Sequence, residues 1–162
     1  MVFPDNNIAS DPESSLVDCA VAEGIRHIGI STYSSGKVKD FLMNKGYSDN
    51  IAEAAVAELV DRKYIDDTKA AGKVLRYRSL KKQESKCYIL QRLLAAGIDP
   101  DLAEEVVSSL PADSDTCLML FNALGFEEDS EDVRKAMIDL AMKRGYDYQI
   151  ADHAYSVWSE SL

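Results

Sequence analysis

The sequence predicts an all-α protein made of three tandem three-helix repeats. Three observations lead to this prediction. Apolar residues recur at helical spacing along most of the chain, glycines follow several of these segments, and one helix–turn–helix pattern occurs three times. The chain has 162 residues, of which only four are proline and eight are glycine. This length and composition suit a single continuous helical domain.

The repeated pattern is centred on Gly46, Gly97 and Gly145, which are almost evenly spaced along the chain. Valine, isoleucine or methionine precedes each glycine by eight positions, leucine or alanine precedes it by four, and tyrosine or isoleucine follows it directly. Apolar or alanine positions also recur on the far side of each turn. These matches need no gap, which favours a repeat over the chance similarity of helical hairpins.

The first repeat is predicted at residues 13–63, after a flexible N-terminal tail at residues 1–12. Its helices are predicted at residues 13–30, 35–45 and 49–62. Ser34 is a good N-cap for the second helix, and Ser48 or Asp49 can cap the third. Glycines at 24 and 29 lower the helix propensity of the first segment.

The second repeat is predicted at residues 66–111 and the third at residues 113–159. Their helices are predicted at residues 66–82, 86–96, 100–110, 113–124, 130–144 and 147–158. Acidic residues suit the positive ends of helices, so Asp66 and Asp67 are expected to start the first of these and Asp113 to cap the fourth. Gly125 is expected to end that fourth helix.

The remaining composition indicates a soluble cytoplasmic protein. No apolar run is long enough to cross a membrane, and the N-terminus lacks the basic and apolar regions of a signal peptide. Cys19, Cys87 and Cys117 are odd in number and lie in apolar helical patterns, so we expect reduced cysteines in the core. They have no neighbours that would complete a metal site.

Charge is distributed unevenly along the chain. The net charge is −10 and the pI is about 4.6, which makes the whole surface a poor binder of polyanions. Positive charge nevertheless collects in the predicted helix at 66–82, opposite a stripe of Ala70, Val74 and Tyr77. The basic residues are Lys69, Lys73, Arg76, Arg78, Lys81 and Lys82. This pattern is typical of a solvated helix face, and it also suits a surface for an acidic partner or nucleic acid.

Enzymatic alternatives have weaker support in the sequence. The run from Tyr64 to Asp67 coincides with the Tyr-x-Asp-Asp string of reverse transcriptases, but helix capping explains both acids and no third carboxylate accompanies them. His27 and His153 are isolated, and no phosphate-binding glycine motif occurs. We therefore expect no enzyme activity, no catalytic residue, no cofactor and no metal site.

The order of several short motifs resembles the RecX family of regulatory proteins. These motifs are Tyr33-Ser34, Lys45-Gly46-Tyr47, Tyr64-Ile65-Asp66-Asp67, Gly97-Ile98 and Arg144-Gly145-Tyr146. The resemblance extends from about residue 14 to residue 158. It implies tandem three-helix repeats that form a curved, elongated array. The residues that carry the family motif in a structural role are Gly46, Tyr64, Asp66, Asp67, Gly97 and Gly145.

The resemblance also implies a function that periodicity alone does not reveal. Members of the RecX family bind in the groove of the RecA filament on single-stranded DNA, inhibit recombinase ATPase and strand exchange, and so act in DNA repair, recombination and the SOS response. The basic residues from Lys69 to Lys82 are the predicted partner-binding surface, with weak direct DNA contact. A direct nucleic-acid-binding helical module is the alternative, and a monomer is expected in both cases.

Overall fold

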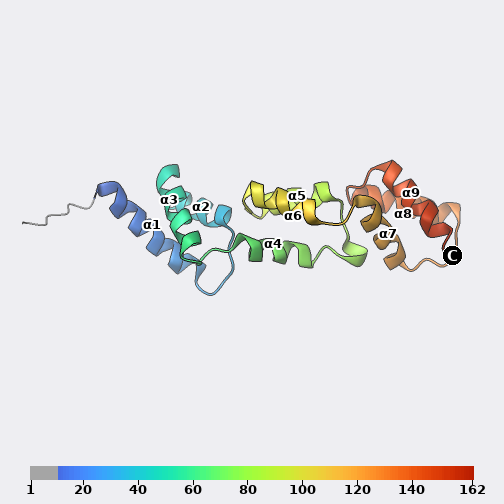
Figure 1. The fold of residues 1–162 in the computed structure, drawn as a ribbon, viewed down its shortest axis with the longest axis horizontal. Coiled ribbons are helices and arrows are strands. Elements are labelled where there is room, and N and C mark those ends of the chain that lie inside the picture. Colours follow the sequence, from blue (N-terminus) through green and yellow to red (C-terminus); the bar gives the residue numbers. More distant parts are fainter. Residues whose placement is uncertain (1–10) are drawn as a thin grey trace, which may run out of the picture. The chain divides into compact units, whose positions relative to one another are not determined.

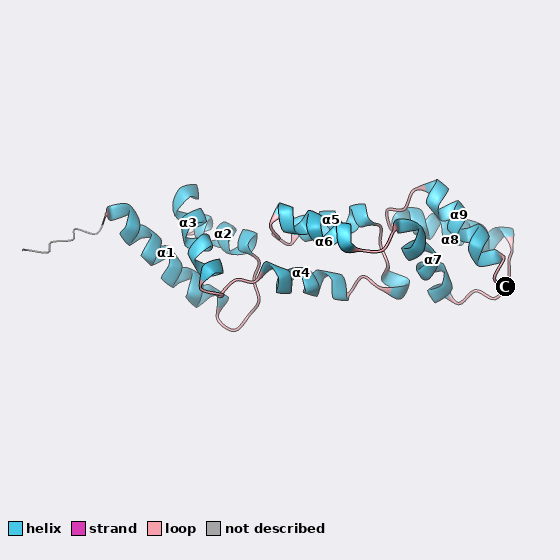
Figure 2. Ribbon diagram, viewed as in Figure 1, coloured by secondary structure: helices cyan, strands magenta, loops and turns pink. Residues whose placement is uncertain are grey.

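The computed structural model describes residues 11–162, and in that range it contains nine α-helices, one short 3-10 helix and no strand (Figures 1 and 2). The predicted all-α fold class is confirmed. The predicted tail at residues 1–12 lies outside the described residues, except for Asp11 and Pro12. The chain divides into two compact units, one ending at Asp66 and the other covering Asp67–Leu162.

The first unit contains α1 (Pro12–Ile28), α2 (Ser35–Asn44) and α3 (Asp49–Asp61). The predicted serine caps are present: Ser34 Oγ accepts the Lys37 N–H, and Ser48 Oγ accepts the Ile51 N–H. The three helices pack on one another around a common core. Its buried members are Ala20, Val21, Ile28, Val38, Leu42, Ile51, Ala52, Ala55, Val56, Leu59 and Ile65.

Helix α1 continues through Gly24 although glycine has a low helix propensity, because the packing of α1 requires a residue without a side chain there. It is buried in α1, and a Cβ built on it would lie 2.6 Å from Leu59 Cδ1 of α3. Glycine therefore allows α1 and α3 to approach closely at this point. Gly29 has a φ of 52° and ends the helix.

The second unit contains six α-helices and the 3-10 helix η1. Their bounds are α4 (Asp67–Arg76), η1 (Leu80–Lys82), α5 (Lys86–Ala95), α6 (Pro100–Ser109), α7 (Asp113–Leu124), α8 (Glu131–Lys143) and α9 (Tyr148–Ser159). One buried cluster lies among α4, α5 and α6 and includes Ile89 and Leu93. Another lies among α7, α8 and α9 and includes Phe121 and Trp158. With the core of the first unit, these clusters are consistent with three helix groups.

The three glycines of the sequence repeat occupy turns of the same geometry. Gly46, Gly97 and Gly145 have φ values of 101°, 77° and 88°. Each glycine N–H donates to the carbonyl three residues earlier, over 2.9 to 3.0 Å, and the next residue's N–H donates to the carbonyl five residues earlier, over 3.1 to 3.2 Å. This pair of bonds is a Schellman motif, which requires a left-handed residue at the glycine position.

The predicted helix at 66–82 is wrong in its second half. α4 ends at Arg76, Ser79 is extended, and Leu80 has a φ of 53°, so the backbone leaves the helical region. The prediction that Tyr77 belongs to the apolar stripe is also wrong, because its side chain is 62% exposed. Leu75 is half-buried on the inner side of the helix instead.

Two further predictions are corrected. Cys19 and Cys87 are exposed, and only Cys117 is a core cysteine, because the first two lie on the outward sides of α1 and α5. Asp113 is the first residue of α7 and does not cap it, since its Oδ1 accepts the Lys86 backbone N–H at 2.8 Å. Gly125 ends α7 in the left-handed conformation, as predicted.

Candidate partner-binding surface

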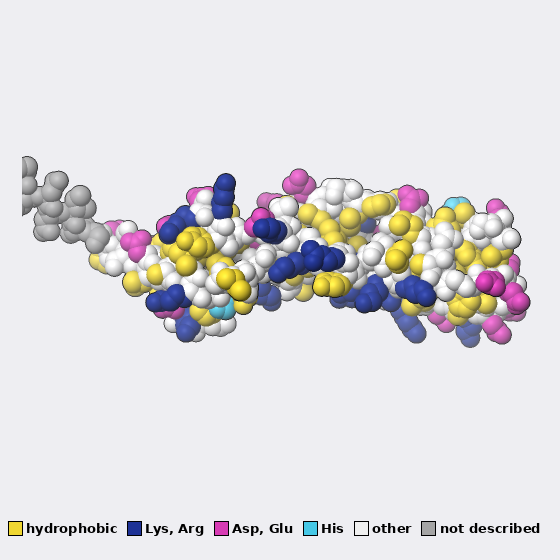
Figure 3. Space-filling model, turned by 90° about the horizontal axis from the view of Figure 1, so that it is seen from below, with side chains coloured by type: hydrophobic (Ala, Val, Ile, Leu, Met, Phe, Trp, Pro, Cys, Tyr) yellow, Lys and Arg dark blue, Asp and Glu magenta, His cyan; other side chains and the backbone are white. Residues whose placement is uncertain are grey.

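The exposed side of α4 is basic. Lys69, Lys73 and Arg76 follow one another at the spacing of a single helix face, and all three are exposed. Ala70 and Ala71 are buried on the other side, which fixes the orientation of the helix. Figure 3 shows Lys and Arg side chains collected on one face of the second unit, with hydrophobic side chains among them.

The basic surface continues past the end of α4 into η1. Lys81 and Lys82 are exposed in η1. Two large apolar side chains are exposed in the same segment, Tyr77 at 62% and Leu80 at 64%. The surface therefore offers apolar groups together with positive charge, a combination that protein interfaces use.

Arg78 is the one predicted partner-binding residue that turns inward. Its Nε lies 3.4 Å from Oε2 of Glu84, whose side chain is only 3% exposed. Arg92 contacts the same carboxylate through two hydrogen bonds, from Nε to Oε2 at 2.5 Å and from Nη2 to Oε1 at 2.6 Å. Hydrogen bonding with Glu84 raises the pKa of the Arg92 guanidinium. Arg78 thus helps to neutralise a buried carboxylate, and the other five residues remain on the surface.

Contacts from distant parts of the second unit hold the segment that follows α4. The Ser85 N–H donates to the Arg144 carbonyl at 3.0 Å, and Arg144 Nη2 donates to the Lys81 carbonyl at 3.2 Å. Gly145 lies beside this junction, where an added Cβ would be 2.5 Å from both Ser85 Oγ and Tyr88 Cδ1. The loop that carries Leu80 and Lys81 is consequently tied to the turn between α8 and α9.

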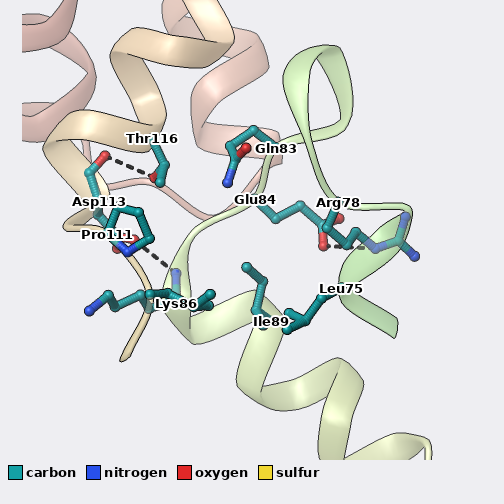
Figure 4. Close-up of a pocket in the computed structure, with 10 residues that line it drawn as sticks. Leu75, Arg78, Gln83, Glu84, Lys86, Ile89, Pro111, Asp113 and Thr116 are labelled. Atoms are coloured by element: carbon teal, nitrogen blue, oxygen red, sulfur yellow. Dashed lines mark hydrogen bonds and ion pairs between the residues drawn. The ribbon is translucent and has the colours of Figure 1, made fainter. Parts of the chain in front are cut away.

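A cavity of about 100 Å³ lies next to the Glu84 ion pair (Figure 4). Figure 4 shows Arg78 and Glu84 joined on one side of it, with Lys86 and Asp113 joined near the start of α7. Sites for drug-sized ligands have volumes of roughly 300 to 1,000 Å³. This cavity is smaller, so we assign it no cofactor.

Three of the predicted family-motif residues, Tyr64, Asp66 and Asp67, lie at or next to the start of α4. Ile65 is buried, while Tyr64 is 41% exposed with the guanidinium carbon of Arg62 5.4 Å from its ring centroid. Asp67 is in the first turn of α4, and its Oδ2 accepts the Asp99 N–H at 3.1 Å.

No group of three or more His, Cys, Asp or Glu side chains arranged for a metal occurs within residues 11–162.

The first unit also contains a cluster of aromatic and basic residues that no pattern in the sequence predicts. The rings of His27 and Phe41 stack with their centroids 3.8 Å apart, and Lys45 Nζ lies 5.5 Å from the Phe41 centroid. Together with Arg26 and Glu23 these residues line a hollow of about 430 Å³. His27 lies on α1 and Phe41 on α2, so no sequence motif joins the two residues.

Glu84 and Arg92 were also missed. They stand eight residues apart, in a polar segment that contains no recognised motif. Only the burial of Glu84 and its contacts with both Arg78 and Arg92 identify them.

Among the described helices, none combines the length and the apolar character that a membrane crossing requires.

Comparison with known proteins relates this architecture to one family. The chain is 26% identical over 136 residues to the regulatory protein RecX of Pelodictyon phaeoclathratiforme, covering 80% of this chain and 82% of the relative. Its fold matches the crystal structure of RecX from Lactobacillus salivarius with a TM-score of 0.67 and 16% identity, over 90% of this chain and 97% of the other. The resemblance to the RecX family is confirmed.

The two RecX comparisons support different statements. The crystal structure is too distant in sequence to show more than the fold, and it shows that the described helices follow the RecX fold. The sequence relative is named a regulatory protein. No family model matches the chain. Neither comparison identifies the residues that would contact a partner.

Proposed function

We propose that this chain regulates homologous recombination by binding in the groove of the RecA filament on DNA and inhibiting recombinase ATPase and strand exchange. The proposal includes a non-enzymatic mechanism, a monomeric protein and action in the cytoplasm during DNA repair and the SOS response. The similarity to a RecX regulatory protein carries this proposal. The basic surface of α4 and η1 supports it, because a nucleoprotein filament presents both DNA phosphates and protein carboxylates.

The proposed architecture for this role is an array of three repeats, at residues 13–63, 66–111 and 113–159. The identical turns at Gly46, Gly97 and Gly145 support it. An array of this kind contacts successive protomers of a filament through several small interfaces, and linked interfaces bind more tightly than any one alone. Binding across protomers would oppose the rearrangements that ATP hydrolysis and strand exchange require.

The partner-binding residues in this proposal are Lys69, Lys73, Arg76, Lys81 and Lys82, with Arg78 in a supporting position behind them. Five of these cations are exposed on one continuous segment of a protein whose net charge is −10. A local basic surface on an acidic protein steers binding to one orientation, since the remaining surface repels polyanions.

Direct binding of nucleic acid by the same surface is the second candidate function. The cations spaced along one face of α4 and the exposed ring of Tyr77 favour it, because single strands bind through phosphate contacts and base stacking. The two candidates differ in their dependence on salt. Binding to naked single strands weakens with a slope of about −0.7 for each phosphate contact.

Charge reversal tests the proposed function. The triple variant K69E/K73E/R76E is added to RecA on single-stranded DNA, and ATP hydrolysis and strand exchange are measured against the unaltered protein. We expect the concentration for half-inhibition to rise by on the order of tenfold or more, because attraction at three sites becomes repulsion. The control K37E/K135E/K143E changes the net charge equally at exposed lysines outside this surface and should inhibit normally.

The outcomes separate the two functions. If the unaltered protein leaves RecA ATPase and strand exchange unchanged at stoichiometric excess, the regulator function is wrong. If it also binds naked single strands tightly, with a salt slope that falls in the triple variant, direct nucleic-acid binding replaces it. If both triple variants inhibit normally, the regulator function stands and the assignment of its surface is wrong.

A further inference from the structure

Leu80 has a backbone conformation that leucine normally avoids. Its φ is 53°, and Lys63 is the only other non-glycine residue in the described range with a positive φ. Residues other than glycine are disfavoured there because Cβ approaches the following carbonyl oxygen. Such a conformation persists only where the surrounding structure imposes it, and it occurs preferentially at functional sites.

The surrounding contacts fix Leu80 from both sides. Its own carbonyl accepts the Gln83 N–H at 3.0 Å, and the Ser79 carbonyl accepts the Lys82 N–H at 3.0 Å. The next carbonyl, of Lys81, accepts from Arg144 Nη2 at 3.2 Å. Gln83 and Glu84, which follow directly, are buried. The turn is therefore held in place by the rest of the second unit.

This fixed turn does not bury the leucine. Its side chain is 64% exposed, and η1 packs on α7 without covering it. Exposed lysines follow at 81 and 82, and the exposed ring of Tyr77 precedes it. Figure 3 shows hydrophobic side chains among the Lys and Arg side chains on this part of the surface. A turn with a fixed backbone thus presents an apolar side chain within a basic surface.

We propose that Leu80 is an apolar anchor that inserts into a hydrophobic socket rimmed by carboxylates on a protein partner. This inference rests on the proposed function and specifies its contact: the socket lies on the recombinase filament protein, not on DNA. Because hydrogen bonds hold the backbone of this turn, binding through Leu80 costs little ordering of the backbone, which favours an interface anchor. The lysines beside it complement an acidic rim and would orient the insertion.

DNA phosphate is a poorer occupant for this position. Contacts between lysines and DNA phosphates are electrostatic, so their contribution to affinity is the same whether residue 80 is apolar or polar. A second copy of this acidic chain could supply carboxylates, and the test treats self-association as a separate outcome. An apolar recess on a protein partner would cover the exposed leucine, which contacts to phosphate would not.

Leu80→Asn and Leu80→Gly test the inference. Asparagine and glycine accept a positive φ, so both variants should fold with a melting temperature no lower than that of the unaltered protein. Binding is measured by fluorescence anisotropy of the labelled chain, titrated with RecA filaments on oligo-dT and separately with naked oligo-dT. We expect filament affinity to fall by about 10- to 100-fold, the effect of losing one buried leucine. Affinity for naked DNA should be unchanged.

Two controls isolate the cause. Lys63→Gly relieves the other positive φ, in the first unit, and should leave filament binding unchanged. Leu94→Asn removes an exposed leucine from α5, outside the basic surface, and should also bind normally. Analytical ultracentrifugation of the unaltered protein and Leu80→Asn measures self-association in parallel.

Each result supports or overturns the inference. If the unaltered protein binds no filament, the proposed function and the anchor are both wrong. If it binds and both Leu80 variants bind equally well, only the anchor is wrong. Weaker binding to naked DNA, or loss of self-association in place of filament binding, would assign Leu80 to another contact and overturn the inference. A lower melting temperature would show that Leu80 supports the fold, which also overturns it.

Discussion

Replacing Gly145 by alanine tests the junction that holds the loop after α4. Gly145 has a φ of 88°, and a Cβ on it would lie 2.5 Å from Ser85 Oγ and from Tyr88 Cδ1. Gly125 is the matched control in the same unit, because its φ is 75° and a Cβ there would meet nothing within 4 Å. Both substitutions introduce backbone strain, and only Gly145→Ala adds a steric clash.

The structure gives an expected size for each effect. A left-handed alanine costs about 1 to 2 kcal/mol relative to glycine, which applies to both variants. Overpacking against Ser85 and Tyr88 adds about 1 to 3 kcal/mol in Gly145→Ala alone. For a unit of this size, 1 kcal/mol shifts the melting temperature by about 4 to 8 °C. Gly145→Ala should therefore melt at least about 4 °C below Gly125→Ala.

Thermal unfolding followed by circular dichroism, together with urea unfolding, measures the two variants. The unfolding of the second unit is the transition to compare, since the chain divides into two compact units. Equal destabilisation by the two substitutions would refute the reasoning. It would mean that Ser85 and Tyr88 do not approach Gly145 as closely as the structure indicates.

Two further predictions concern the thiols and the buried carboxylate. Burial raises the pKa of the Cys117 thiol to about 12. In the folded protein at pH 8, a thiol reagent should therefore modify the exposed Cys19 and Cys87 rapidly, and Cys117 only on unfolding. Mass spectrometry counts the modified sites, and fast labelling of Cys117 would contradict its burial. Glu84→Gln should destabilise the second unit by about 2 to 3 kcal/mol in urea unfolding, less than for a fully buried pair because both arginine partners are partly exposed. The exposed Asp152→Asn variant is its control and should leave the unfolding midpoint almost unchanged; an equal shift in both would disprove the role of the Glu84 ion pair.

Local signals in the sequence were sufficient for most helices and turns. The hydroxyls of Ser34 and Ser48 cap the helices that follow them, and the glycine of each repeat occupies a left-handed turn. These features depend on residues within one or two turns of each other, so their spacing reveals them. The resemblance to RecX rests on the same short motifs and was confirmed by comparison.

Features that depend on distant residues could not be read in this way. The segment from 77 to 82 contains no proline or glycine, and its composition predicts continued helix. Tertiary contacts override that propensity: Glu84 is buried with Arg78 and Arg92, and Arg144 holds the Lys81 carbonyl. The inward orientation of Arg78 follows from the same contacts.

The sequence by itself determined the helical class, the start and end of most helices, the repeated glycine turn and the family resemblance. Only the tertiary structure decided where α4 ends and which cations remain on the surface. It also decided that Leu80 is exposed in a turn with a positive φ. The physical reason is the range of the interactions. Capping and periodicity act between near neighbours in the chain, whereas the burial of Glu84 and the bond from Arg144 join residues that only folding brings together.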